Sequence, residues 1–136
     1  LTFVKVKNNT TANHLKGFKK NLYGPTENYT VKAINLNKYL KKNSLIKMDI
    51  EGSENKVLKS IALNKWKSCD CLVSIHNAKV AKDIFNFFKN KNIYMFASKS
   101  NWNLVNKFQD IPTCHAEGLL FISSKKSMNW SNINSF

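Results

Sequence analysis

The stretch Ser44–Leu58, SLIKMDIEGSENKVL, decides the fold of this chain. It opens with a nearly continuous apolar run, Ser44–Ile50, which is typical of a strand buried on both faces. A helix is predicted over Glu54–Trp66 because its apolar residues return at helical spacing, and Ser53 is placed to cap that helix. Between them, Gly52 lets the backbone turn sharply. A buried strand, a tight turn and an amphipathic helix form the unit from which α/β sheets are built.

The same alternation continues toward the C-terminus. The next elements are predicted as a strand, a helix and two strands, at Cys71–His76, Ala78–Lys89, Ile93–Ala97 and Leu119–Ser123. Strands joined by helices through short connections pair in parallel by right-handed crossovers. The last two strands lack a helix between them, so we expect the last strand to be antiparallel. The predicted fold class is therefore α/β with mostly parallel strands, in which Ser44–Ile50 is a central strand beside Cys71–His76.

The N-terminal third has a different character. Its predicted elements are a strand at Leu1–Lys7, a long polar loop at Asn8–Tyr29, a strand at Tyr29–Leu36 and a short helix at Asn37–Lys42. Long loops in compact domains are usually functional or disordered. We expect one domain over residues 1–124 and a C-terminal tail at 125–136. The chain begins with Leu1 rather than Met, which suggests a fragment, a processed product or an incomplete gene model.

Composition narrows the classes of function. The formal net charge is +14, and all 22 basic residues are lysine. Specific readers of bases and phosphates favour the bidentate guanidinium of arginine, so we expect no specific nucleic-acid partner, only salt-sensitive adhesion to polyanions. No apolar run approaches the length that spans a bilayer, and no signal peptide is visible, which favours a cytoplasmic location. A lysine-rich binding module without chemistry remains the alternative.

The three cysteines do not suggest a framework of disulfides. An odd count without repeated spacing favours reduced, partly buried thiols. The pair Cys69 and Cys71 could join Cys114 and His115 around zinc, but the spacing differs from the usual zinc motifs. We therefore assign no metal ligand from the sequence.

Acidic residues gather at one place although the chain has only eight of them. Asp49, Glu51 and Glu54 fall at the end of the apolar strand and in the first turn of the next helix. Ligands of open α/β sheets bind outside the carboxyl ends of the strands. Glu54 is expected mainly to cap the helix, where the helix dipole favours an acid. Asp49 lies between two apolar residues, and a carboxylate buried there needs partners, as in functional sites.

His76 follows the next predicted strand, again at a carboxyl end. It is either a second site residue or a histidine that satisfies the start of the following helix. His14, in the long loop, and His115, near the last strand, are expected to be incidental.

Several segments together resemble the FkbM family of methyltransferases. Leu45–Leu58 resembles that family's strand with an acid, a glycine and a second acid, and Val31–Leu40 resembles an upstream segment, with Asn37 where an aspartate is usual. Leu72–His76 resembles its following strand, with Ser74 in place of a glutamate. The segment Glu117–Ile122 resembles its closing strand.

This resemblance implies methyl transfer from S-adenosylmethionine to a hydroxyl of a sugar or another small metabolite. It implies the C-terminal portion of a class I, Rossmann-like methyltransferase sheet. It places Asp49 beside cofactor and acceptor, with Glu51 and Gly52 as further cofactor-binding residues. Asp49 or His76 could take the hydroxyl proton. No G-x-G loop exists in the chain, so we expect the half that carries the cofactor loop to be absent. We also expect this chain alone to bind the cofactor poorly. A third hypothesis is a non-catalytic relative that only scaffolds a partner.

Overall fold

The computed structural model describes residues 1–9, 12–17 and 24–127. Its strands are β1 (Thr2–Val6), β2 (His14–Leu15), β3 (Thr26–Thr30), β4 (Ser44–Met48), β5 (Cys69–Ser74), β6 (Tyr94–Ala97), β7 (Asn103–Leu104) and β8 (Leu119–Ser123). The α-helices are α1 (Glu54–Ser60) and α2 (Ala78–Phe88). Short 3-10 turns lie at Leu36–Lys38, Lys65–Lys67, Ser98–Ser100, Phe108–Asp110 and His115–Glu117. The mixture of helices and strands confirms the predicted α/β class at this coarse level.

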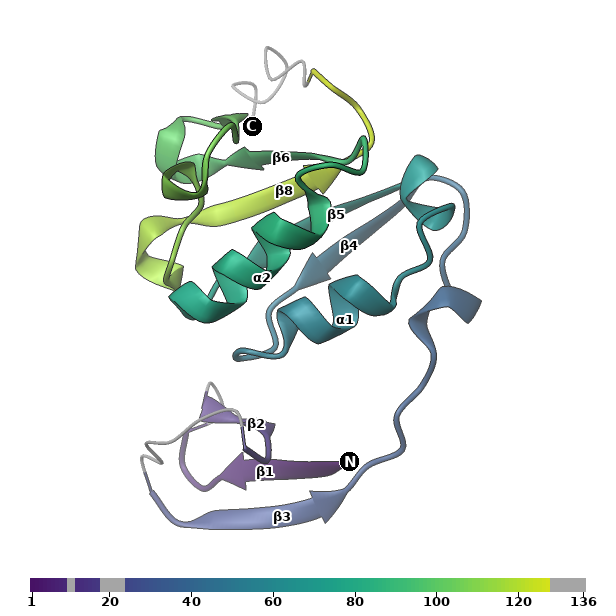
Figure 1. The fold of residues 1–136 in the computed structure, drawn as a ribbon. Helices are drawn as coiled ribbons and strands as arrows, with labels where there is room; N and C mark the ends of the chain where they lie inside the picture. Colours follow the sequence, from purple (N-terminus) through teal and green to yellow (C-terminus); the bar gives the residue numbers. More distant parts are fainter. Residues whose placement is uncertain (10–11, 18–23, 128–136) are drawn as a thin grey trace, which may run out of the picture.

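The N-terminal strands form a small sheet of their own, which lies below α1 in the view of Figure 1. Its order is β2-β1-β3 and both pairings are antiparallel. The predicted strand at Tyr29–Leu36 is wrong, because β3 covers Thr26–Thr30 and pairs residue by residue with β1. The polar residues that begin β3 give no hydrophobic pattern from which the strand could be predicted. The strand forms because it pairs with β1.

Two further predictions for this region need correction. The long loop predicted at Asn8–Tyr29 contains β2 and most of β3, while residues 10–11 and 18–23 of it lie outside the described residues. The helix predicted at Asn37–Lys42 is a single 3-10 turn, Leu36–Lys38, which Asn35 caps by accepting a hydrogen bond from the backbone N–H of Asn37.

The second sheet is five-stranded and mixed, with the order β4-β5-β8-β6-β7. The antiparallel last strand is confirmed, because β8 pairs antiparallel with both β5 and β6. The prediction of mostly parallel pairing is not confirmed: in the described part of the chain, β4–β5 is the one parallel pair of this sheet. The reason is that β8 inserts between β5 and β6, so these two strands run the same way without touching.

The prediction that Ser44–Ile50 forms a central strand is wrong for the described chain. β4 pairs with β5 in parallel, as expected, but it forms one edge of the sheet. It also ends at Met48, which is buried, whereas Leu45 on the opposite face is 70% exposed. The apolar run therefore belongs to an edge strand with one buried face.

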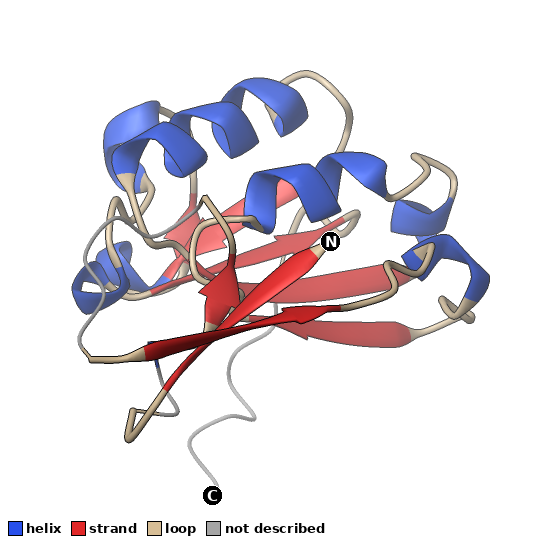
Figure 2. Cartoon of the chain, turned by 90° about the horizontal axis from the view of Figure 1, so that it is seen from below, coloured by secondary structure: helices blue, strands red, loops and turns tan. Residues whose placement is uncertain are grey.

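Both helices cover the same face of this sheet, so that helices and strands form two layers (Figure 2). The core between the layers includes Leu58 of α1, Ile84 of α2 and Val73 of β5, all nearly inaccessible to solvent. α1 ends at Ser60 rather than at the predicted Trp66, because Ile61 is already extended. The buried Trp66 packs edge-on against Phe88, with ring centroids 5.1 Å apart.

Two sequence expectations about the ends of elements remain. Ser53 precedes α1 as predicted, but its side chain makes no capping hydrogen bond. The predicted tail at 125–136 lies mostly outside the described residues, which end at Ser127.

None of the helices in the described ranges has both the length and the apolar composition needed to cross a membrane.

Candidate functional site

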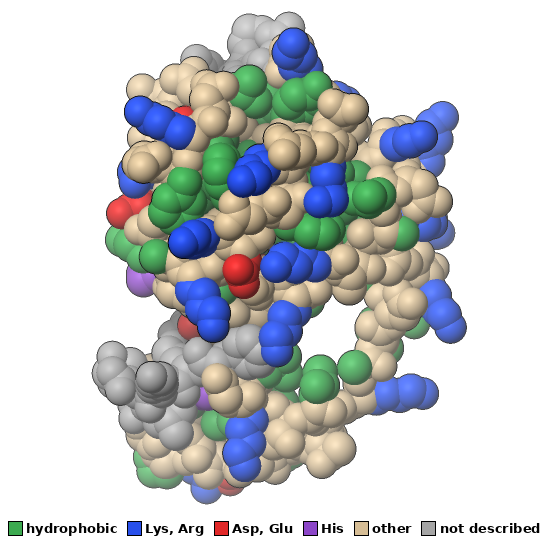
Figure 3. All heavy atoms as spheres, in the orientation of Figure 1, with side chains coloured by type: hydrophobic (Ala, Val, Ile, Leu, Met, Phe, Trp, Pro, Cys, Tyr) green, Lys and Arg blue, Asp and Glu red, His purple; other side chains and the backbone are tan. Residues whose placement is uncertain are grey.

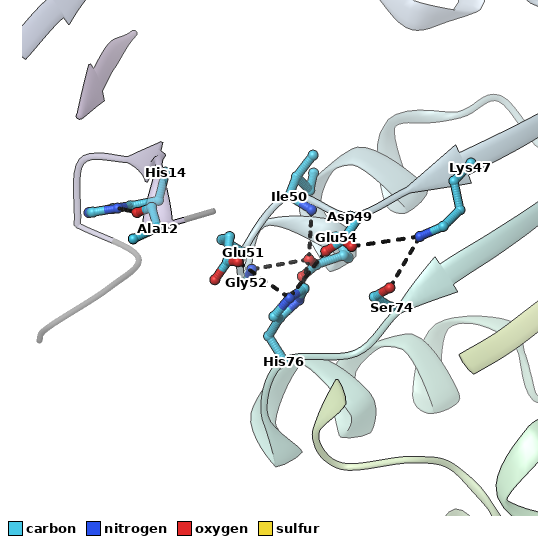
Figure 4. A network of polar contacts seen from close by, with 10 residues as sticks. All are labelled: Ala12, His14, Lys47, Asp49, Ile50, Glu51, Gly52, Glu54, Ser74 and His76. Atoms are coloured by element: carbon cyan, nitrogen blue, oxygen red, sulfur yellow. Dashed lines mark hydrogen bonds and ion pairs between the residues drawn. The ribbon is translucent and has the colours of Figure 1, made fainter. Parts of the chain in front are cut away.

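The candidate site lies where β4 and β5 end. Met48 pairs with Val73 in the parallel register, so the loops that follow the two strands leave the sheet at the same edge. One loop carries Asp49 and Glu51, and the other carries His76. Their side chains converge in Figure 4. The predicted site residues are thus brought together by the pairing of two strands.

Glu54 connects the two loops at this edge through hydrogen bonds. It is fully buried, and its Oε1 accepts hydrogen bonds from Nδ1 of His76 at 2.8 Å, from the backbone N–H of Gly52 at 3.1 Å and from that of Ile50 at 3.2 Å. Its other oxygen, Oε2, is buried and finds no hydrogen-bond partner among the described residues. The expectation that Glu54 mainly caps a helix therefore missed its role. Its spacing from Leu58, one turn later on the buried face, was the signal available in the sequence.

The imidazole of His76 meets acidic groups on both of its nitrogens. While Nδ1 bonds to Glu54, Nε2 lies 3.2 Å from Oδ1 of Asp49 and 3.9 Å from Oε1 of Glu51. The His76 side chain is 15% exposed and that of Glu51 is 26% exposed. Three carboxylates therefore surround the largely buried ring of His76.

Ionisation of the buried pair follows from these contacts. The hydrogen bond to Glu54 raises the pKa of His76 above its usual value, against the opposing effect of burial, and the charges of Glu54, Glu51 and Asp49 add to the increase. Burial by itself raises the pKa of Glu54, but the hydrogen bonds from His76 and from the backbone N–H of Gly52 outweigh it, so this pKa is lowered. The pair is thus held toward its charged forms.

Asp49 is not buried, contrary to the sequence prediction. Its side chain is 55% exposed, and its Oδ2 lies 3.8 Å from Nζ of Lys47. Lys47 also donates a hydrogen bond of 3.2 Å to Oγ of Ser74 on the neighbouring strand. The difference arises because β4 ends before Asp49 and has no neighbour on its outer side among the described strands.

The turn between β4 and α1 holds Glu51 in an uncommon backbone conformation. Glu51 has φ +56° and Gly52 has φ +101°, both in the left-handed region. A glutamate adopts this region only when its surroundings impose it. Here the two hydrogen bonds from the flanking backbone N–H groups to the buried Glu54 fix the turn. The strained turn directs Glu51 toward His76.

The other two histidines differ from each other. His14 is buried on β2, where its Nδ1 lies 2.8 Å from the carbonyl oxygen of Ala12, which is a structural contact. His115 is exposed, but its ring centroid lies 6.3 Å from that of His76. His115 therefore borders the site, a proximity that the sequence did not indicate.

None of the three cysteines belongs to the cluster of Asp49, Glu51 and His76 in the described chain. All three are free thiols, and Cys69 and Cys71 are buried on β5. Burial raises the pKa of the Cys71 thiol to about 12, which keeps it protonated and unreactive near neutral pH. Among the described histidines, cysteines and acids, the group whose potential ligand atoms lie within 4.8 Å of one another is Asp49, Glu51 and His76.

A known protein family matches most of this chain. The family profile of the methyltransferase FkbM domain matches residues 3–110 of the chain. The chain belongs to the FkbM methyltransferase family. No curated protein and no solved structure matches it. The matched part of the FkbM domain runs from β1 to the turn at Phe108–Asp110 and includes Asp49, Glu51 and His76.

The site of this FkbM domain suits part of the methyl donor that the family implies. S-adenosylmethionine carries a positive sulfonium, and the carboxylates of Asp49 and Glu51 supply negative charge at an accessible sheet edge. Gly52, with its positive φ, allows the backbone to approach a ligand closely. The described residues provide no glycine-rich loop for the rest of the cofactor. The fit therefore concerns the charged, reacting end of the cofactor.

Proposed function

We propose that this domain takes part in S-adenosylmethionine-dependent methylation of a hydroxyl group on a sugar or another small metabolite. The observation that supports it best is the convergence of Asp49, Glu51 and His76 at the carboxyl ends of β4 and β5 within an FkbM domain. S-adenosylmethionine would supply the activated methyl group. The residues of this chain would orient the acceptor and receive its proton.

Proton transfer is the part of the reaction that the geometry supports most directly. An attacking hydroxyl must lose its proton, and a base within hydrogen-bond reach accelerates that loss. Asp49 is accessible and its Oδ1 faces Nε2 of His76. The ring of His76 is held in place by its bond to Glu54. We propose Asp49 and His76 as the catalytic residues and Glu54 as the residue that positions His76.

Cofactor binding is proposed for Asp49, Glu51 and Gly52. The two carboxylates would attract the sulfonium, whose positive charge they complement. We further propose that residues 1–124 are a partial domain whose strands β4, β5, β6 and β8 form the C-terminal portion of a class I, Rossmann-like sheet. The glycine-rich cofactor loop would then be contributed by residues outside this chain. A carbohydrate or small-molecule acceptor and a cytoplasmic setting complete the proposal.

The substitution Asp49→Asn tests this assignment in the protein that joins this domain to its cofactor loop. Asparagine keeps the size and polarity of the side chain and removes its charge. If the carboxylate steers or takes the proton, turnover of methyl-labelled S-adenosylmethionine should fall on the order of 10²-fold. The melting temperature should stay close to that of the unmodified protein, because the Asp49 side chain is 55% exposed.

Measuring turnover and melting temperature together separates catalysis from structure. Asp83→Asn is a matched control, since Asp83 is also partly exposed and contacts Lys59 and Asn55 away from His76. Unchanged turnover of Asp49→Asn with a lowered melting temperature would show that Asp49 only stabilises the turn.

A further inference from the structure

The acidic edge described above has an excess of negative charge around one nitrogen atom. Nε2 of His76 faces oxygen atoms of two carboxylates, Asp49 and Glu51, and a third carboxylate, Glu54, holds Nδ1. Lys47 contacts Asp49 through the other oxygen, Oδ2, and leaves Oδ1 directed at His76. Two carboxylate oxygens and a ring nitrogen thus converge on one small volume.

Proton placement leaves Nε2 available as a ligand atom. Oε1 of the buried Glu54 accepts from two backbone N–H groups, so its contact with Nδ1 of His76 requires that Nδ1 carry a proton. In a neutral ring the lone pair then lies on Nε2. In the charged ring Nε2 carries a proton toward the two carboxylates, and a divalent cation would replace that proton and its positive charge.

The distances approach those between ligand atoms around one metal ion. For bonds of about 2.1 Å, adjacent ligand atoms around an octahedral ion lie about 3 Å apart and opposite ones about 4.2 Å apart. Here the nitrogen lies 3.2 Å from one carboxylate oxygen and 3.9 Å from the other, and all three atoms lie within 4.8 Å of one another. Small side-chain movements would bring one ion into contact with all three.

The surroundings of His76 match those of a metal-binding histidine. Such histidines donate the proton on their second nitrogen to a carboxylate or a carbonyl, which fixes the ring and increases its basicity as a ligand. Glu54 supplies that carboxylate at 2.8 Å from Nδ1 and is itself fully buried. This support lies outside the cluster of ligand atoms and is independent of the distances among them.

We propose that Asp49, Glu51 and His76 bind a divalent first-row transition-metal ion. One imidazole and two carboxylates form a mixed nitrogen and oxygen set that suits Mn²⁺ or Fe²⁺ better than Ca²⁺, which prefers oxygen alone. Three protein ligands leave coordination positions open. The exposure of Asp49 provides access to them from solvent.

This site rests on the proposed function and deepens it: with an ion bound, Asp49 and His76 would act as its ligands, and the open positions could bind oxygen atoms of the hydroxyl-bearing acceptor. A bound cation lowers the pKa of a coordinated hydroxyl and so favours its deprotonation. In that role the acceptor would need a second oxygen near the hydroxyl, as vicinal diols of sugars have. Metal binding itself requires neither the methyl donor nor the acceptor, so it can be tested apart from methyl transfer.

Titration of this chain with Mn²⁺ alone, followed by electron paramagnetic resonance of the free ion, tests the proposal. Mn²⁺ is chosen because it binds thiols weakly, which excludes the cysteines. We expect one ion per chain, and we expect Asp49→Asn and His76→Gln each to weaken binding at least tenfold. Glu54→Gln should weaken it about 10- to 100-fold, as loss of an outer partner does. Asp83→Asn, whose carboxylate lies on α2 outside the cluster, should leave the affinity unchanged.

Circular dichroism of each variant identifies any that fail to fold, and the exposed Asp49→Asn keeps the test decisive if Glu54→Gln unfolds. The proposal is overturned if the unmodified chain binds no Mn²⁺ at millimolar concentration. It is also overturned if His76→Gln binds as tightly as the unmodified chain, which would indicate only loose attraction to surface acids. Mn²⁺ binding by this chain, together with no methyl transfer by the protein that joins this domain to its cofactor loop, would leave this site standing and remove the proposed function instead.

Discussion

At the scale of single residues, the pair of Glu54 and His76 governs the site. Glu54 has no exposed surface, yet one of its oxygens accepts three hydrogen bonds, two from the backbone and one from His76. A buried carboxylate is costly unless such partners compensate for lost hydration. The same bonds position the turn that carries Glu51, so this one side chain links the stability of the loop to the geometry of the site.

The pair predicts a characteristic dependence of stability on pH. The raised pKa of His76 contributes stability that is complete below pH 6.5 and is lost as pH rises through the folded-state pKa. The lowered pKa of Glu54 contributes stability that is complete above pH 4.5 and is lost as pH falls through its folded-state pKa. With a chelator present, Glu54→Gln should therefore lower the melting temperature most between these two values, on the order of 5 °C, and less at pH 9.

Glu117→Gln is the matched control for this prediction. The pKa of Glu117 is also lowered, first by the hydrogen bond from the backbone N–H of Thr113 and then by Lys99, but no histidine takes part. Its effect on the melting temperature should stay level from pH 6 to pH 9. A Glu54→Gln effect that is equally level over that range would mean that His76 is uncharged in the folded chain.

At the scale of elements, β4 and α1 each carry a leucine, and the two leucines differ in how much they contribute to the free energy of unfolding. Leu45 projects from the open face of an edge strand and is 70% exposed, whereas Leu58 lies between α1 and the sheet with no exposed surface. Burial, rather than residue type, sets the free energy that a leucine contributes. Comparing substitutions at Leu45 and Leu58 therefore tests which face of the strand–helix unit belongs to the core.

Leucine-to-alanine substitutions at these two positions test this division. Leu58→Ala should reduce the free energy of unfolding by about 3 kcal/mol, since it removes buried methyl groups and leaves a cavity. Leu45→Ala should change it by about 0.5 kcal/mol or less. Urea denaturation of the three chains gives both values. A large loss at Leu45 would show that this face is covered in solution.

At the scale of the whole molecule, charge is the dominant feature. The formal net charge is +14, and lysine side chains are scattered over the face that Figure 3 shows instead of lining a single groove. A diffuse distribution of this kind attracts polyanions without geometric selectivity. Lysine also lacks the planar guanidinium with which arginine makes bidentate contacts to guanine and phosphate.

We accordingly expect weak and unselective binding to DNA. Fluorescence anisotropy with two duplexes of equal length and unrelated sequence should give the same affinity for both at about 50 mM salt. Because counterion release drives such binding, the affinity should fall by a factor on the order of 10³ by about 200 mM salt. A preference for one duplex that persists at the higher salt would instead favour the lysine-rich binding module.

The sequence by itself determined the local units and the family. The strand, glycine turn and helix around Ser44–Leu58, the α/β alternation and the cluster of acids all follow from periodicities of neighbouring residues. The match to the FkbM domain covers residues 3–110, which include that segment. These features are encoded within a few residues of one another, where backbone geometry fixes which side chains share a face.

The tertiary structure alone decided which of these units meet. β8 inserts between β5 and β6, β4 becomes an edge strand, and His76 reaches Glu54 across 22 positions of sequence. As a result, Asp49 is exposed, the reverse of what its neighbours in the sequence indicated, and Glu54 is buried. Strand order and burial depend on contacts between distant segments, whose free energies no local pattern records. The pairing of β4 with β5 is therefore what converts separate acids and a histidine into one site.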